Sequence, residues 1–226
     1  MKVALIGHGS MGRVIERLAR ERGHEVVVAS RELSEISGCD VAIDFSAADA
    51  VRGNVEACVA AGVPIVVGTT GWDSEREEVE KIVAENNGAM VYGANFSLGV
   101  NIFYKVADFA AALFAKFPEY EAFIEEQHHS RKKDAPSGTA LKLKEIVLRY
   151  VEVGDVAATR AGNIPGTHRV GFDGPADQIA LSHTARSREG FALGAIMAAA
   201  WIIGRKGFFE FGSVMDKVSS GADLMP

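Results

Sequence analysis

The feature that most constrains the fold is an alternation of short apolar runs and helical segments over the first hundred residues. The pattern predicts five strands, at residues 3–6, 25–29, 40–45, 65–68 and 89–92. Helical spacing fills three of the gaps between them, at residues 11–22, 47–61 and 74–86. Strands joined by helical crossovers form a doubly wound parallel sheet with helices on both faces. We therefore expect an α/β fold of the Rossmann type, with ligands bound at the carboxyl ends of its strands.

A glycine-rich loop follows the first of these strands. Gly7-His-Gly-Ser-Met-Gly12 fits the pattern G-x-G-x-x-G and opens a helix. Such glycines permit a tight turn and a close backbone approach to a pyrophosphate, and the helix start supplies N–H donors. The loop predicts a dinucleotide site; a glycine turn in an α/β fold that binds another ligand is the alternative. The expected cofactor contacts in this loop are Gly7, Gly9, Ser10, Met11 and Gly12.

The end of the second strand lacks the carboxylate that usually binds the ribose of NAD. Ser30 and Arg31 stand at that place and can donate to a 2′-phosphate. Glu32 follows directly and could accept from a ribose hydroxyl instead. The cofactor is therefore predicted to be NADPH or NADH, with NADPH favoured; the alternative is that Arg31 is a solvated surface residue.

The pattern changes after about Leu98. A long helix is expected at residues 100–117, a strand at 120–127 and a second helix at 137–151. Short strands follow at 169–172 and 178–183, separated by glycine and proline turns. This is an α+β pattern on a mixed or antiparallel sheet. We expect a dinucleotide-binding domain at 1–97 and a second domain at 98–191, with the last helix and tail, about 192–226, returning to the first.

Residues 125–140 concentrate polar chemistry in one loop, with adjacent histidines at 128 and 129 and three cations at 131–133. Ser137 is a natural N-cap, so Gly138 and Thr139 would present free N–H groups at the positive end of a helix, a site suited to a carboxylate. A histidine with a pKa near neutrality can donate a proton there. A zinc site and a purely structural charged loop are the alternatives. Adjacent histidines point apart, so we expect no metal.

The same loop carries a family resemblance. The run His-His-x-x-Lys-x-Asp-Ala-Pro-Ser-Gly-Thr-Ala resembles the signature of the dihydrodipicolinate reductase family. Further motifs of the family occur in the same order, and the likeness covers essentially the whole chain. They are Asp44-Phe45-Ser46, Gly68-Thr69-Thr70-Gly71, Asn95-Phe96-Ser97-x-Gly99-Val100-Asn101 and Arg160-x-Gly162-x-x-x-Gly166-x-His168.

The resemblance implies roles for individual residues. His128 would be the general acid, and Lys132 would bind a substrate carboxylate and help polarise the ring. The second carboxylate would be held at the helix start, by Ser137, Gly138 and Thr139, with His129 close by. Further cofactor contacts would come from three later segments. These are Gly68, Thr69 and Thr70, then Ala94, Asn95 and Phe96, and finally Arg188.

The implied reaction is reduction of a cyclic imine dicarboxylate by NAD(P)H in lysine and diaminopimelate synthesis. The second domain would bind this small-molecule substrate and assemble a homotetramer through its sheet. Two features depart from the family: the glycine loop is one residue shorter and lacks the arginine before Met11, and the second strand does not end on an acid. Another two-domain dehydrogenase, for aspartate or homoserine, and a redox sensor that binds NAD(P)H without turnover are the rival functions.

Composition bounds the partners. The net charge of −6 argues against a nucleic-acid binder. The most apolar stretch, 191–203, is too short and too rich in alanine to span a bilayer, so no membrane partner is expected. The chain starts on a strand-like run, which indicates no signal peptide. Cys39 and Cys58 have no metal-ligand spacing and are expected to be buried free thiols, as in a cytoplasmic protein.

Overall fold

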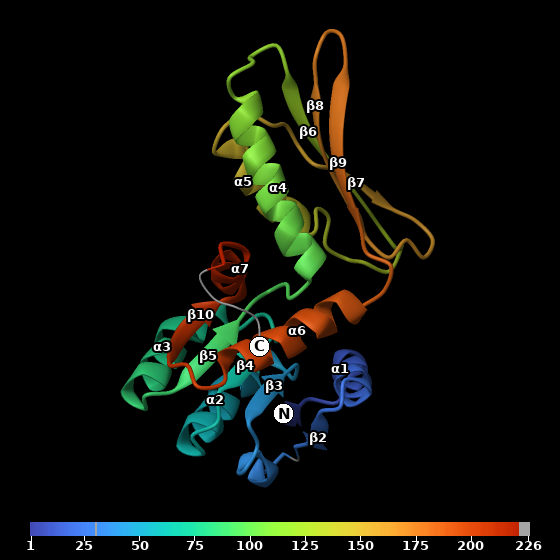
Figure 1. Ribbon diagram of the computed structural model, residues 1–226. Coiled ribbons are helices and arrows are strands. Elements are labelled where there is room, and N and C mark those ends of the chain that lie inside the picture. The colour runs from blue at the N-terminus through green and yellow to red at the C-terminus, as the bar shows by residue number, and fades with distance from the viewer. Residues whose placement is uncertain (30, 222–226) are drawn as a thin grey trace. The chain divides into compact units, whose positions relative to one another are not determined.

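The chain forms two compact units in the computed structural model, which describes residues 1–29 and 31–221 (Figure 1). The first unit combines Met1–Ser97 with the segment from Arg188 onward, and the second is Leu98–Ser187. The first contains a parallel sheet flanked by helices, and the second contains a separate mixed sheet. The predicted fold class, an α/β Rossmann-type domain with an α+β domain, is confirmed.

The sheet of the first unit has six strands in the order β10-β5-β4-β3-β1-β2, and every neighbouring pair is parallel. Its first five strands lie where the sequence predicts them. They are β1 (Lys2–Ile6), β2 (Glu25–Val28), β3 (Val41–Asp44), β4 (Ile65–Val67) and β5 (Ala89–Tyr92). The prediction of five strands was wrong by one, because β10 (Gly207–Glu210) adds to the edge beside β5. Its four residues begin on a glycine and show no alternation, so no strand pattern is visible there.

Helices cover both faces of this sheet. α1 (Ser10–Glu21) packs against α6 (Glu189–Ile202), which lies on β3, β4 and β5. α2 (Val51–Ala60) and α3 (Arg76–Glu85) pack on each other. Together with the strand side chains on that face of the sheet, they enclose a hydrophobic core. The strands are apolar on both faces, as a sheet covered on both sides requires. A last helix, α7 (Phe211–Ser219), follows β10.

The alanine-rich composition of α6 has a packing reason. Gly194 on this helix meets the carbonyl oxygen of Phe96 so closely that a Cβ at residue 194 would overlap it. Its alanines 192, 195, 198 and 199 are fully buried. Small side chains let a helix axis approach a sheet closely, so this stretch is core of the first unit. Among the described residues, no helix is long and apolar enough to cross a membrane.

The second unit places two helices on a four-stranded sheet of order β7-β6-β8-β9. The helices are α4 (Leu98–Phe114) and α5 (Gly138–Leu148), and the strands are β6 (Glu121–His128), β7 (Ala157–Arg160), β8 (Thr167–Asp173) and β9 (Gln178–Thr184). β7 pairs parallel with β6, and the other two pairings are antiparallel. The core joins Phe103, Ile124, Leu143, Val170 and Phe172. β7 was not predicted, because Ala-Ala-Thr-Arg is exposed and has no apolar alternation.

Candidate functional site

The glycine loop between β1 and α1 is shaped by close backbone contacts. Gly7 has φ +86°, and a Cβ there would overlap the backbone of Phe45. A Cβ at Gly12 would overlap the carbonyl oxygen of Gly7. Gly9 caps α1 without any side-chain hydrogen bond, so the first N–H groups of the helix are left for a ligand. The loop therefore has the form of an anion site at a helix start.

A buried carboxylate fixes the neighbouring loops at the carboxyl ends of β3 and β4. Asp44 is fully buried and accepts hydrogen bonds from Ser46 N at 2.8 Å, Asn54 Nδ2 at 2.8 Å and Thr69 Oγ1 at 3.2 Å. Thr69 Oγ1 also accepts from Ser46 N. The hydroxyl of Thr69 is thus used within the protein, whereas Thr70 is exposed.

The remaining predicted cofactor contacts differ in how accessible they are. Phe96 is buried and packs against Phe45 and Phe211, with ring centroids 6.2 and 4.5 Å apart. Arg31 is exposed, and so is Arg188, the N-cap residue of α6. Ala94 is exposed, and the Asn95 side chain accepts from Ser97 N at 2.9 Å. Ser30 lies outside the described residues.

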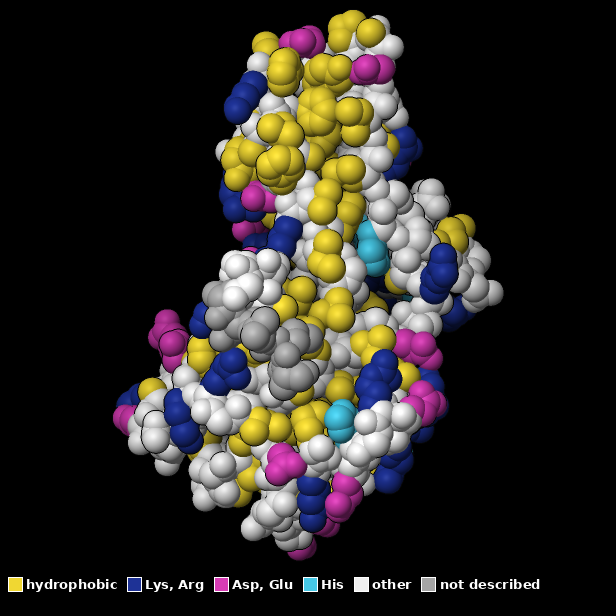
Figure 2. Space-filling view, viewed as in Figure 1, with side chains coloured by type: hydrophobic (Ala, Val, Ile, Leu, Met, Phe, Trp, Pro, Cys, Tyr) yellow, Lys and Arg dark blue, Asp and Glu magenta, His cyan; other side chains and the backbone are white. Residues whose placement is uncertain are grey.

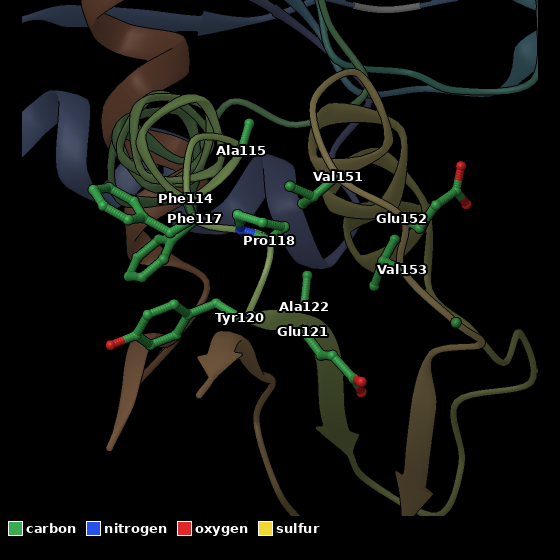
Figure 3. A pocket seen from close by; sticks show the side chains of 11 residues that line it. Phe114, Ala115, Phe117, Pro118, Tyr120, Glu121, Ala122, Val151, Glu152 and Val153 are labelled. Carbon is green, nitrogen blue, oxygen red and sulfur yellow. The ribbon is translucent and has the colours of Figure 1, made fainter. Parts of the chain in front are cut away.

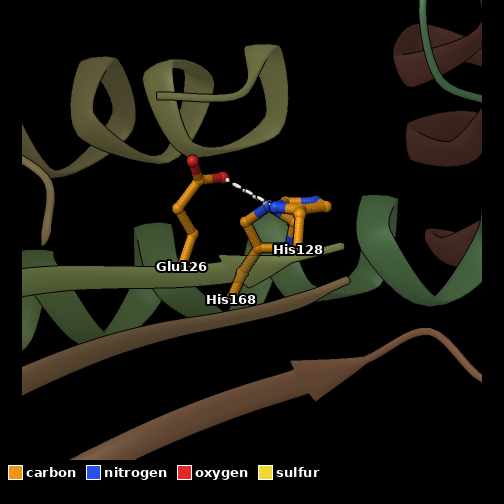
Figure 4. A group of neighbouring side chains, drawn as sticks. All are labelled: Glu126, His128 and His168. Carbon is orange, nitrogen blue, oxygen red and sulfur yellow. Dashed lines mark ion pairs between the residues drawn. The ribbon is translucent and has the colours of Figure 1, made fainter. Parts of the chain in front are cut away.

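In the second unit, sheet register gathers four polar side chains on the face that packs against α5. Ile124, Glu126 and His128 occupy every second position of β6. They therefore share one face of the strand, the one that points into the unit. His168 on β8 lies directly opposite Glu126, and Arg160 on β7 lies beside His128. Figure 4 shows Glu126, His128 and His168 converging beneath the helix. Three strands therefore build one buried polar cluster at the end of β6.

Glu126 is the centre of this cluster. Its Oε1 accepts from Ser137 N at 2.9 Å and from the Arg160 guanidinium at 2.6 Å, and its Oε2 accepts from the Ser137 hydroxyl. Burial acts to raise the pKa of Glu126, but the hydrogen bonds from Ser137 and Arg160 outweigh it and leave the pKa below its ordinary value. The buried side chain is therefore a carboxylate at neutral pH.

The two buried histidines approach the same oxygen of that carboxylate. His128 Nδ1 is 3.3 Å and His168 Nε2 is 3.5 Å from Glu126 Oε2. Burial lowers the pKa of His128, and the charge of Glu126 opposes that shift. Burial, followed by the proximity of His128, lowers the pKa of His168 to about 4. His168 is therefore neutral at pH 7.

The helix start beside the cluster is open. Ser137 caps α5 as predicted, with its Oγ accepting from Ala140 N at 3.3 Å. Gly138 is exposed, and a Cβ there would meet nothing within 4 Å. Thr139 and His129 are half-buried, and Lys132 Nζ pairs with Asp134 Oδ1 at 2.8 Å. The N-terminus of α5 at Gly138 is thus accessible, with Ser137 and Thr139 on either side of it in the chain.

Three members of the cluster were missed as site residues by sequence reasoning: Glu126, Arg160 and His168. The signal for Glu126 was a charged residue at an inward position of a strand, next to Ile124. The signals for Arg160 and His168 were weaker, because their strands can be aligned with β6 only when the pairing is known. The ligand atoms of Glu126, His128 and His168 lie within 4.8 Å of one another, a spacing that also suits a metal ion.

Comparison with known proteins decides the family. A family model described as "Dihydrodipicolinate reductase, C-terminus" matches residues 99–215, and one described as "Dihydrodipicolinate reductase, N-terminus" matches residues 24–96. The chain belongs to the dihydrodipicolinate reductase family. The predicted resemblance and the predicted class of enzyme, an oxidoreductase, are confirmed. The N-terminal match begins after the glycine loop at residues 7–12, and it is this loop that departs from the family pattern.

Relatives span the full length. The 4-hydroxy-tetrahydrodipicolinate reductase of Christiangramia forsetii is 36% identical, over 95% of this chain and 98% of its own. The enzyme of the same name from Archaeoglobus fulgidus is 34% identical, over 96% and 100%. A solved structure, dipicolinate-bound dihydrodipicolinate reductase from Paenisporosarcina sp., has the same fold, with a TM-score of 0.75 at 21% identity over 93% of this chain and 97% of that one.

Proposed function

We propose that this member of the dihydrodipicolinate reductase family reduces 4-hydroxy-tetrahydrodipicolinate, with NADPH or NADH, in lysine and diaminopimelate synthesis. The observation that carries the proposal is the pairing of a buried histidine with an open helix start. His128 and Ser137 both contact Glu126, and Gly138 leaves the N-terminus of α5 accessible. A proton donor next to an anion site is what reduction of a carboxylated imine needs.

The residues of the first unit fit a dinucleotide. The backbone approach at Gly7 and Gly12 leaves no room for side chains, and the unpaired N–H groups of α1 suit a pyrophosphate. Gly9, Ser10 and Met11 complete the loop. The bound cofactor would supply the hydride. Thr69 would contribute through its backbone, because its hydroxyl is bonded to Asp44, while Thr70 can offer its side chain.

Residues of the second unit would bind and protonate the substrate. Gly138 and Thr139 would bind one carboxylate with backbone N–H groups, and Lys132 would bind the other and oppose the negative charge of the dianion. Lys132 must first exchange its partner Asp134 for the substrate. His128 would donate a proton to the carbon next to the hydride acceptor, with His129 close to the helix-bound carboxylate.

A preference for NADPH is proposed for the end of β2. Arg31 is exposed there and offers a planar, permanently charged donor that matches phosphate geometry. An exposed contact of this kind contributes about 1–2 kcal/mol, roughly a 5- to 30-fold preference. NADH should therefore still be used.

Turnover with freshly generated substrate tests the function and separates it from its rivals. We expect oxidation of NADPH and NADH that depends on the cyclic dicarboxylate. Aspartate and homoserine dehydrogenases would respond to their own substrates instead. A redox sensor would bind the cofactor and show no such oxidation.

Assembly into a homotetramer through the second unit is also proposed, with the outer side of α4 as a contact surface in addition to the sheet that the resemblance implies. The outer side of α4 is apolar: Ile102, Val106, Phe109 and Leu113 are exposed at helical spacing. Figure 2 shows apolar side chains gathered over this surface. A pocket of about 670 Å³ extends it beside Phe117 and Tyr120 (Figure 3). Exposed apolar patches of this kind mark contact surfaces.

A cytoplasmic location is proposed from the chemistry of the cysteines. Cys39 and Cys58 are both free and buried. Burial raises the pKa of Cys58 to about 12, so its thiolate is not formed at neutral pH. Burial also raises the pKa of Cys39, and two free thiols with raised pKa values suit a reducing compartment.

A further inference from the structure

We propose that Glu126 is a positioning residue for His128: it accepts the hydrogen bond of Nδ1–H, so that Nε2–H is the proton delivered to the substrate. The family resemblance gave Glu126 no role. The inference deepens the proposed function and rests on it for the reaction step, but its geometric part can be tested without substrate.

The orientation of the carboxylate is fixed by three donors. Ser137 N and Arg160 hold Oε1, at 2.9 and 2.6 Å, and the Ser137 hydroxyl holds Oε2. These donors come from the loop before α5 and from β7, so the carboxylate cannot rotate without breaking contacts to two elements. The acceptor capacity left on Oε2 faces the two histidines.

The direction of the Ser137 hydrogen bonds determines which histidine is free to donate to Glu126. That hydroxyl has a single proton, which it donates to Glu126, so its oxygen can only accept from other groups. His168 Nε2 lies 3.1 Å from the Ser137 oxygen and must therefore be the donor in that bond. The proton of His168 is thus committed to Ser137. Glu126 remains available to His128.

His128 has a matching unpaired atom. Its Nδ1 is buried and makes no hydrogen bond within residues 1–29 and 31–221, yet Glu126 Oε2 is 3.3 Å away. A small shift of the ring brings this pair into hydrogen-bonding range. In that arrangement Glu126 selects the neutral tautomer that carries its proton on Nδ1, as carboxylates do for other histidines.

The opposite side of the ring is bounded by Gly166. This residue has φ +133°, and a Cβ there would be 3.2 Å from His128 Nε2. The absence of a side chain at 166 therefore keeps Nε2 clear. His128 lies between a carboxylate at Nδ1 and a bare backbone at Nε2, which leaves Nε2 as the nitrogen that can deliver a proton.

Charges from every neighbouring element act on His128. Glu126 on its own strand and Asp134 in the loop before α5 favour the imidazolium. Lys132 in that loop and Arg160 on β7 oppose it, and His168 on β8 is neutral at pH 7. Glu126 has the largest favourable effect, so its loss would leave the two cations dominant.

The step balances in protons and electrons. The Nε2–H bond of the imidazolium breaks as the carbon–hydrogen bond of the product forms, and the electron pair stays on Nε2. Nδ1–H remains bonded to Glu126, which stays ionised because Ser137 and Arg160 hold its pKa low. Solvent restores the lost proton after product release.

A bound metal ion is the rival use of Glu126, His128 and His168. The guanidinium of Arg160 already neutralises this carboxylate, and Lys132 adds a second cation near His128. A third positive charge would be repelled by both, which is why we favour hydrogen bonding over coordination.

Nitrogen-15 NMR of the histidine side chains tests the geometry in the wild-type protein. His128→Gln identifies the signals of His128 among the six histidines. We expect neutral His128 to carry its proton on Nδ1. Protonation at Nε2 with Nδ1 bare would overturn the proposal, whether or not the enzyme turns over.

Glu126→Gln tests the effect on the reaction, with Glu125→Gln as the matched control. Glu125 is the neighbouring carboxylate, and it points away from the cluster and pairs with Arg169. Turnover of the wild type should fall as pH rises through the pKa of His128. In Glu126→Gln that fall should move to lower pH by about one unit or more. At pH values above the fall, turnover should be roughly 10-fold lower than in the wild type. Glu125→Gln should match wild type.

Three results would contradict the inference. A raised KM with an unmoved pH profile would make Glu126 merely structural, as would an unchanged pKa of His128 in the NMR titration. Stoichiometric metal in the purified enzyme, lost in Glu126→Gln, would favour coordination. A wild type without reductase activity would instead remove the proposed function, and the NMR result would still decide the role of Glu126.

Discussion

His128 and Lys132 are four residues apart, yet the proposed reaction asks different things of them. His128 is buried against Glu126, whereas the Lys132 side chain is 24% exposed and pairs with Asp134. One would move a proton, and the other would bind charge. Their variants should therefore differ in which kinetic constant changes.

Replacing His128 by Gln should lower turnover roughly 100-fold or more, because general acid catalysis contributes about that much. The dissociation constant of NADPH, measured by fluorescence titration, should stay nearly unchanged, since the predicted cofactor contacts lie in the first unit. His129→Gln is the comparison at the neighbouring histidine, which is proposed to lie close to the helix-bound carboxylate rather than to donate the proton. Turnover close to wild type in the His128 variant would remove it from the mechanism and favour His129.

Lys132→Gln should change KM and turnover together. A charged partner of a substrate carboxylate contributes about 2–4 kcal/mol to the transition state, so kcat/KM should fall by roughly 30- to 1,000-fold. Lys133 is exposed and serves as the control. If kcat/KM fell in the Lys133 variant and stayed unchanged in Lys132→Gln, the loop would be aligned one residue out of register with the family.

The local sequence predicted the loop residues of this site better than the strand residues. The position of Ser137 before Gly-Thr-Ala predicts that it is an N-cap. Glu126 and His168 become neighbours only through the antiparallel register of β6 and β8, and Arg160 only through the parallel pairing of β7. Register depends on contacts between distant segments, so the local sequence signals a charged residue at an inward position of β6 but not which residues join it in the cluster.

At the scale of elements, the end of β2 should set cofactor choice. Arg31→Asp should weaken NADPH binding strongly and leave NADH binding similar or better, because a carboxylate repels a 2′-phosphate but accepts from a ribose hydroxyl. Parallel titrations of both cofactors against wild type and variant measure the effect. If neither affinity changes, Arg31 is a solvated surface residue and the specificity lies elsewhere.

The junction of β6, β8 and α5 should make stability depend on pH. His168 has a pKa of about 4 in the folded chain against an ordinary value of 6.5, so the unfolded chain binds a proton in that interval and the folded chain does not. Its contribution is complete above pH 6.5 and is lost as pH falls towards 4, by about 3 kcal/mol.

Urea unfolding between pH 7 and pH 4 measures this contribution as the difference between wild type and His168→Gln. Gln keeps a donor for the Ser137 oxygen but does not titrate. The variant should lose less stability on acidification than wild type, with His24, His128 and His183 accounting for part of the remaining slope. Equal slopes in the two proteins would contradict the assignment.

Elements with strong periodicity were predictable, and edge elements were not. β1 to β5 and their crossover helices follow from apolar runs that both faces of a covered sheet require. β7 and β10 are short edge strands, each paired on one side. Their residues are stabilised by a neighbouring strand rather than by burial of an alternating face, so their sequences carry little strand signal.

At the scale of the whole molecule, the proposed assembly depends on the outer side of α4. Phe109 is the most exposed of the large apolar side chains there, at 66%. Phe109→Glu should therefore shift the protein from tetramers to smaller species in light scattering after size exclusion, with Lys105→Glu as a control on the same helix. A monomeric wild type, or an unchanged tetramer in the Phe109 variant, would contradict assembly through this face.

Hydride transfer to the cyclic dicarboxylate is the central claim, and a labelled cofactor tests it most directly. NADPH carrying deuterium at both positions of C4 of the nicotinamide is mixed with freshly generated 4-hydroxy-tetrahydrodipicolinate and enzyme. Mass spectrometry should find tetrahydrodipicolinate containing one deuterium atom, in an amount equal to the NADP⁺ formed. The account is contradicted if cofactor is not oxidised in the presence of this substrate, or if the product carries no label.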